Sequence, residues 1–304
     1  MRRAVLGAFL LAAALAQGPS GSLELRAEAR YLPGLGAFTL EPVYAGSWLA
    51  SAAWGDAYVE AALYPSWNLA TDRLDAGVSK LDIGYGNGRF ALGLGVSPEP
   101  TATLRLVPPF ALVVPAADHL PGLAGAWFEA YPAPARRLRL ALRRVSERPV
   151  GLVRTDGRLG AVDYQLFALY GPAPAPAALG MGASTRAGSW IVYGEAWRRW
   201  RSPEPWSGGV GASRYLAGGL FTVEAAYAQG WRLAAGYGGQ LAEAWTLDAL
   251  ARIAWPSGGP GALYAGARLT YLGPEGDVML GLACAHDPAR GTAWLPVLGA
   301  RVYY

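Results

Sequence analysis

The sequence predicts an all-β protein whose antiparallel strands close into an up-and-down transmembrane β-barrel. Apolar and polar side chains alternate along most of the chain, which is the period of a strand with two different faces. Charged residues make up only 16%, against about 25% in a typical soluble domain. Apolar residues reach 53%, yet beyond the N-terminal region no apolar run of ~18 residues could form a spanning helix. Apolar side chains spread in alternation suit a barrel wall with lipid on one side.

The N-terminus has the features of an export signal. Met1-Arg2-Arg3 is basic, residues 4–15 are apolar, and Ala14-Leu15-Ala16 fits the small-x-small cleavage rule. The run is too short to span ~30 Å of hydrocarbon as a helix. We therefore expect residues 1–16 to be a secretory signal peptide and residues 17–304 to form a single barrel domain.

The net charge argues against nucleic acid as a partner. Removing Arg2 and Arg3 lowers the formal charge from +4 to +2, so the remaining chain is nearly neutral. No lysine-rich run is present to contact phosphates.

Two segments show the strand period without interruption. In residues 23–31 the odd positions are apolar, whereas the even positions are charged and begin with Glu24, Arg26 and Glu28. A helix would scatter those charges around its circumference. Residues 76–97 predict a hairpin, with Lys80 and Asp82 on one face and a tight turn of positive φ at Asn87-Gly88.

One strand has the length of a membrane span. Trp245 and Trp255 bracket an alternating run, and ten residues rising ~3.3 Å each at a tilt of about 40° cover roughly 25 Å. Tryptophan at both ends suits the two membrane interfaces. The expected aromatic girdle comprises Trp197, Trp200, Trp245, Trp255, Tyr271 and Tyr304.

The last residues carry a family resemblance. Leu298, Ala300, Val302 and Tyr304 alternate with Gly299, Arg301 and Tyr303, and the sequence stops on an aromatic residue. Together with the export signal, this pattern resembles outer-membrane β-barrel proteins of the porin kind. The resemblance implies localisation in the cell outer membrane, contact with outer-membrane lipids, and delivery to the barrel assembly machinery through the C-terminal strand.

The turn signals give 14–18 strands, with 16 as the best single count because such barrels have an even number. Breaks are expected at Asn87-Gly88, at Asp156-Gly157 and at Ala217-Gly218-Gly219, while residues 32–55 do not divide clearly. The proline-rich segment at about 98–123 is expected to form either two short strands or a long loop folded into the lumen.

Functional side chains are expected on the inward face, because the outward face must be apolar. Arg137, Arg139 and Arg143 share one face of one strand. They either attract anions passing through the pore or pair with carboxylates across the lumen, the slightly favoured alternative. The proposed partners are Glu24, Glu28, Glu60, Asp82, Asp163, Glu195, Glu224 and Asp248. The pore-lining candidates are Arg137, Arg139, Arg143, Glu24, Arg26, Glu28, Lys80, Asp82, Asp163, Glu224, Asp248, Arg252 and Arg268.

No motif indicates catalysis, and we expect no catalytic residue, metal or cofactor. His119 and His286 lack the spacing of a zinc site, and no G-x-S-x-G turn or phosphate-binding glycine loop is present. His286 beside Asp287 is the one half of a catalytic pair that the sequence offers. Cys284 shares parity with Leu280 and Leu282, which predicts a lipid-facing side chain.

These observations favour a passive or weakly selective channel for small polar solutes or ions, which could assemble as a homo-oligomer. Two alternatives stay open. One is a barrel enzyme acting on lipid or exported protein, and the other is a non-conducting structural or export and assembly barrel. The sequence does not indicate the solute.

Overall fold

The computed structural model describes residues 20–32, 37–68, 73–99, 104, 106, 122–145, 147–173, 177–257, 259, 261–289 and 291–303. Nearly all of them lie in strands. The first nine strands are β1 (Ser20–Leu32), β2 (Ala37–Trp54), β3 (Ala57–Asn68), β4 (Arg73–Gly86), β5 (Phe90–Ser97), β6 (Leu123–Ala133), β7 (Arg136–Val145), β8 (Arg148–Leu159) and β9 (Val162–Tyr170). The other nine are β10 (Ala177–Ala187), β11 (Trp190–Trp200), β12 (Trp206–Leu216), β13 (Gly219–Tyr227), β14 (Gly230–Ala242), β15 (Trp245–Pro256), β16 (Ala262–Leu272), β17 (Gly276–Asp287) and β18 (Gly291–Tyr303).

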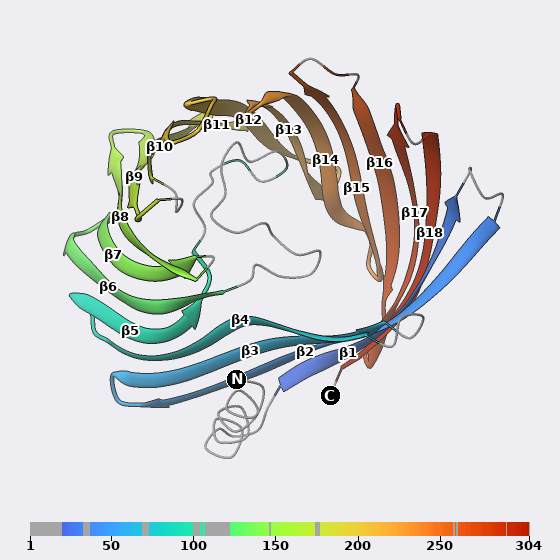
Figure 1. Cartoon of the computed structure of the whole chain (residues 1–304). Helices are drawn as coiled ribbons and strands as arrows, with labels where there is room; N and C mark the ends of the chain where they lie inside the picture. The colour runs from blue at the N-terminus through green and yellow to red at the C-terminus, as the bar shows by residue number, and fades with distance from the viewer. Residues whose placement is uncertain are drawn as a thin grey trace.

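Each strand pairs antiparallel with its neighbours in the chain, and the sheet closes on itself (Figure 1). β18 pairs with β1 in a register that runs from Ser22 opposite Tyr303 to Tyr31 opposite Trp294. The all-β up-and-down barrel predicted from the sequence is thereby confirmed. No helix within the described ranges is long and apolar enough to cross a bilayer.

The sheet has 18 strands, the upper end of the predicted range and above the best single count of 16. The shortfall comes from the undivided residues 32–55, which hold the last residue of β1 and all of β2. Small residues dominate the second half of β2, so the apolar alternation there is weak. The turn from β2 to β3 at Gly55-Asp56 was not among the turn signals from which the strands were counted. Gly55 has the positive φ of a turn, 61°.

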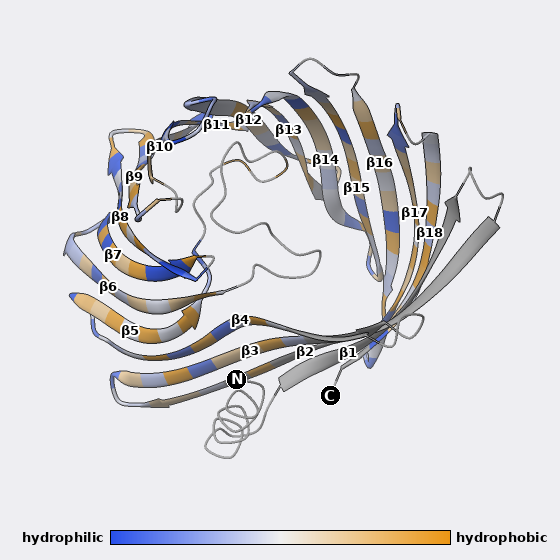
Figure 2. Cartoon of the chain, viewed as in Figure 1, coloured by the Kyte–Doolittle hydropathy of each residue, from blue (hydrophilic) through white to orange (hydrophobic). Residues whose placement is uncertain are grey.

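The two faces of the wall differ in chemistry, and hydrophobic and hydrophilic bands alternate along the strands (Figure 2). Large apolar side chains point away from the lumen and are highly exposed, among them Leu94 at 67% and Leu280 at 62%. Carboxylates such as Asp82, Glu129 and Glu224 are buried on the other face. Because water would make such an exposed apolar surface costly, the outer face fits hydrocarbon as its solvent.

The short turns have defined backbone chemistry. Ala217 and Gly218 join β12 to β13 with φ angles of 48° and 79°, the positive pair required by a two-residue type I′ hairpin. The predicted turn at Asn87-Gly88 is present, but neither residue has a positive φ. The Asn87 side-chain oxygen instead accepts hydrogen bonds from the backbone N–H groups of Arg89, at 2.9 Å, and Phe90, at 3.1 Å.

The predicted turn at Asp156-Gly157 is wrong, because β8 continues through both residues to Leu159. The chain turns later, at Gly160-Ala161. Gly157 serves a different purpose: a Cβ there would lie 2.6 Å from the hydroxyl oxygen of Tyr164 on β9. The glycine leaves room for the tyrosine ring on the outer face, where Tyr164 shares its parity with the exposed Leu166.

Most of the expected aromatic girdle lies on the outer face. Trp200, Trp245, Trp255 and Tyr271 are all exposed, and the Trp245 and Tyr271 rings pack edge-on across β15 and β16. Tyr304 lies outside the described residues.

The assignment of Trp197 to this girdle is wrong. Its side chain is 1% exposed and stacks on Phe167, with ring centroids 5.2 Å apart, inside the barrel. Gly180 on β10 makes this possible, because a Cβ there would lie 2.4 Å from the indole.

The outer face yields a stability prediction. Replacing Leu280 with Arg places a charge on the exposed apolar side of β17, and such a charge near the bilayer midplane costs about 2–4 kcal/mol. We expect urea unfolding of the protein in vesicles to show a loss of that size, whereas Leu280→Val changes little. An unchanged unfolding free energy for Leu280→Arg would contradict a lipid-facing outer surface.

Candidate functional site in the barrel lumen

The inner face of β7 carries the three arginines singled out in the sequence. Arg137, Arg139 and Arg143 share one parity, and their register partners on β8 are Asp156, Arg154 and Val150. The neighbouring leucines, among them Leu140 and Leu142, are exposed on the outer face. All three guanidinium groups therefore face the lumen side of the wall.

These arginines pair with carboxylates. Arg139 donates from Nε to Glu99 Oε1 at 2.8 Å, and its Nη1 contacts Glu129. Arg137 donates from Nε to Asp156 Oδ2 at 2.8 Å, and Arg154 donates from Nε to the other oxygen of Asp156 at 2.7 Å. The arginines are thus paired with carboxylates, but within this wall and not across the lumen.

The partners are nevertheless not those proposed from the sequence. Glu99, Glu129 and Asp156 were all missed as partners of the arginines. Asp156 was assigned to a turn and Glu99 to a loop, so neither was expected to face the arginine strand. Glu129 is on β6, directly opposite Arg139 in the register. Reading β6 in alternation would have found Glu129, because it shares a face with Trp127 and Tyr131.

Arg143 is 1% exposed and contacts residues at the end of β5 and at the start of β6. Its Nη2 donates to Ser97 Oγ at 2.6 Å and to Glu99 Oε1 at 3.2 Å, where β5 ends. Its Nη1 donates to the carbonyl of Leu123 at 3.3 Å, where β6 begins. One buried guanidinium therefore closes the base of the intervening residues 98–122, which we call the lumen segment.

The lumen segment also touches the wall further round. The structure describes Pro98, Glu99, Leu104, Leu106 and Gly122 of it. Leu104 packs on Ala226 and Ala234 and is almost fully buried. The path of the remaining residues lies outside the described part of the chain, and a loop folded into the lumen stays a prediction for them.

Three side chains of that wall hold the backbone of the lumen segment. Glu195 on β11 accepts from the backbone N–H of Leu104 at 3.3 Å, and Glu224 on β13 accepts from the N–H of Leu106 at 2.6 Å. Arg252 on β15 donates to the carbonyl of Leu106 at 2.7 Å. The segment is thus fixed to β7 at Glu99 and to β11–β15 at Leu104 and Leu106.

The other pore-lining candidates fall at separate places on the inner face. Lys80 pairs with Glu60, and Asp82 accepts from the indole Nε1 of Trp127 at 2.9 Å. Asp163 pairs with Arg158 beside the Gly160-Ala161 turn. The side chains of Glu24, Arg26 and Glu28 lie outside the described part of the chain.

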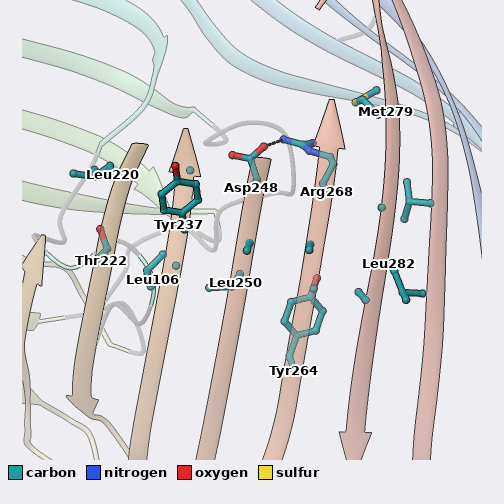
Figure 3. Close-up of a pocket in the computed structure, with 18 residues that line it drawn as sticks. Leu106, Leu220, Thr222, Tyr237, Asp248, Leu250, Tyr264, Arg268, Met279 and Leu282 are labelled. Carbon is teal, nitrogen blue, oxygen red and sulfur yellow. Dashed lines mark hydrogen bonds and ion pairs between the residues drawn. The ribbon is translucent and has the colours of Figure 1, made fainter. Parts of the chain in front are cut away.

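The wall from β13 to β18 lies across the barrel from β6–β8 (Figure 1). A cavity of about 620 Å³ lies against it, lined in part by Asp248, Arg268, Tyr264 and Leu106 (Figure 3). Its volume falls within the ordinary range of small-molecule sites.

The comparisons with known proteins agree on the fold. No family model and no curated protein matches the sequence. Solved structures match over almost their whole length: OccK2 (OpdF) of Pseudomonas aeruginosa has a TM-score of 0.68 at 9% identity, covering 95% of this chain and 99% of that one. The outer membrane protein OpdK of the same organism gives 0.66 at 12% identity, with 95% and 99% covered. OccAB4 of Acinetobacter baumannii gives 0.67 at 8%, with 94% and 97% covered.

The chain folds as a closed antiparallel β-barrel similar to those of these solved structures. At such low identity the likeness extends to the fold alone. One of the similar structures, OccK2, is a complex with glucuronate.

The Glu99 contacts generate a prediction. Glu99→Gln leaves the buried Arg143 without its carboxylate partner, and breaking a buried pair in this way costs about 3–5 kcal/mol. We expect a loss of that order in the unfolding free energy measured in vesicles. Glu147→Gln is the matched control, because Glu147 pairs with Arg144 at an exposed turn and its loss should change stability little. Equal effects of the two substitutions would contradict a buried anchor at Glu99.

Proposed function

We propose that the protein is an outer-membrane channel through which small polar solutes diffuse passively or with weak selectivity. The observation that carries the proposal is the closed barrel with an apolar outer face and a charged inner face. A barrel of this strand number is wide enough for an aqueous channel unless a segment fills it. The contacts of Glu99, Leu104 and Leu106 support a role for the lumen segment in narrowing that channel.

The proposal includes a membrane setting and an assembly route. Residues 1–16 would direct export, β18 would present the C-terminal strand to the barrel assembly machinery, and outer-membrane lipids would cover the exposed leucines. Copies of the chain could also associate as a homo-oligomer in that membrane.

We propose that the protein is not an enzyme. His286, the one candidate for catalysis among the described residues, has its Nδ1 2.9 Å from Thr292 Oγ1 across β17 and β18. Its side chain is exposed at a strand end, which suits a surface hydrogen bond. The similarity to non-enzymatic barrels supports the same view.

Planar-bilayer recording tests the channel directly. The purified protein should produce stable conductance steps in potassium chloride with only a small reversal potential across a salt gradient, because the described lumenal charges are mostly paired. Absence of conductance at every voltage would overturn the proposed function.

Glu129→Gln should shift the reversal potential towards anion permeation, because it releases positive charge from Arg137 and Arg139 into the lumen. The shift is measured in the same salt gradient and should shrink at high ionic strength, where charges in water are screened. Glu147→Gln adds the same formal charge at an exposed turn and should leave the reversal potential unchanged. A shift of equal size in both variants would place the effect outside the lumen.

A further inference from the structure

The cavity on the β13–β18 wall has an ion pair at its centre (Figure 3). Asp248 on β15 and Arg268 on β16 are directly opposite in the register, and Arg268 Nη2 donates to Asp248 Oδ2 at 2.8 Å. Their side chains are 50% and 48% exposed, so oxygen and nitrogen atoms of the pair still face the lumen. The pair therefore offers acceptors and donors together at zero net charge.

Glycines hold this pair open. Gly238 on β14 is opposite Asp248 in the register, and Gly281 on β17 is opposite Arg268. The two strands next to the pair therefore place no side chain directly beside it. A Cβ at Gly238 would stand 3.1 Å from Asp248 Oδ1 and would crowd the carboxylate. A ligand can therefore reach the pair and the backbone on both sides of it.

A phenol completes the recess. Tyr264 and Gly266 are two residues apart on β16 and share its inner face. A Cβ at Gly266 would lie 3.1 Å from the hydroxyl oxygen of Tyr264. The ring stands on the inner face with its hydroxyl directed along β16 towards Arg268 (Figure 3). It adds an apolar ring surface and a group that both donates and accepts hydrogen bonds.

The other strong charges of the lumen named above have partners of their own. Arg137, Arg139 and Arg143 lie against Asp156, Glu129 and Glu99. Arg252, beside Tyr264 in the register, donates to the backbone of the lumen segment. A solute that met the recess would therefore find mixed donors and acceptors with little excess of either charge.

We infer that the Asp248–Arg268–Tyr264 recess binds neutral, hydroxyl-rich solutes of monosaccharide size. This inference rests on the proposed channel function and names its solute class. Hydroxyl groups both donate and accept, so they can satisfy the carboxylate and the guanidinium at the same time. A carboxylate ligand gains attraction from Arg268 but meets repulsion from Asp248, and an ammonium ligand meets the reverse. The neutral polyol keeps both favourable contacts.

Liposome swelling with two solutes of nearly equal size tests this preference. Glucose and glucuronate differ only by a primary alcohol against a carboxylate. The wild-type protein should give a several-fold faster swelling rate with glucose, and glucose should partly block the potassium chloride current in planar bilayers. Faster swelling with glucuronate would overturn the inference.

Substitution of the pair locates the effect. Asp248→Asn with Arg268→Gln keeps the net charge, and we expect it to abolish the current block by glucose and most of the preference over glucuronate. The control is Arg144→Gln with Glu147→Gln, which removes an exposed pair at the turn between β7 and β8 without touching the lumen. A glucose block that survives in the Asp248 and Arg268 variant would overturn the assignment to this recess.

The potassium chloride conductance distinguishes a failure of the proposed recess from a failure of the proposed channel. Heat-modifiable migration in detergent gels first shows that each variant is folded, and Tyr264→Ala provides a second substitution if the double variant fails to insert. Conductance without a glucose preference overturns the recess but leaves the channel standing. Loss of all conductance in the folded wild-type protein overturns the channel and the recess with it.

Discussion

The structure depends on satisfying every backbone hydrogen bond where no water is available. A strand edge in hydrocarbon would leave N–H and C=O groups without partners, each at a cost of several kcal/mol. The pairing of β18 with β1 removes that edge, although the two strands lie at opposite ends of the sequence. Once the sheet is closed, strand geometry assigns every side chain to lipid or to the lumen. The chemistry of the protein is thereby confined to alternate residues.

Charge on those lumenal residues is distributed unequally around the barrel. On β6–β8 the inward arginines pair with carboxylates, and Arg143 and its partner Glu99 are both buried. Buried charges repay their desolvation only when their geometry is satisfied, which suits anchors better than sites for passing ions. On β15 and β16 the Asp248–Arg268 pair remains half exposed. Both walls therefore hold the lumen segment, whereas the Asp248–Arg268 pair stays available to solutes.

Period and composition alone predicted most of the architecture. The strict alternation in β1 and in the hairpin of β4 and β5 was sufficient, because such a pattern has no helical equivalent. The predictions for individual residues failed where one residue type can serve two structural roles, as glycine and tryptophan do here. Gly157 was assigned to a turn but accommodates the Tyr164 ring, and Trp197 was assigned to the lipid interface but stacks on Phe167 inside. In both cases a neighbouring strand decided the outcome, and pairing between strands is not visible in a local window.

Sequence patterns predicted the arginines of the lumenal site but not their carboxylate partners. The arginine strand stood out because three like charges share one parity, but their partners came from β6, β8 and a loop. Glu99 in particular has no strand pattern around it, so its contact with Arg139 depends on how the chain leaves β5. Asp248 and Arg268 were both predicted to line the pore, but as separate residues. The register between β15 and β16 was needed to bring them together.

The way in which the lumen segment is held has a consequence for how this barrel could diversify. At Leu104 and Leu106 the wall grips main-chain atoms, which every residue except proline supplies in the same form. Glu195, Glu224 and Arg252 therefore hold the segment through backbone atoms, and the buried Leu104 side chain adds the one apolar contact described above. Side chains of the lumen segment other than Leu104 can change while these backbone contacts stay the same, so one scaffold could carry many different filters.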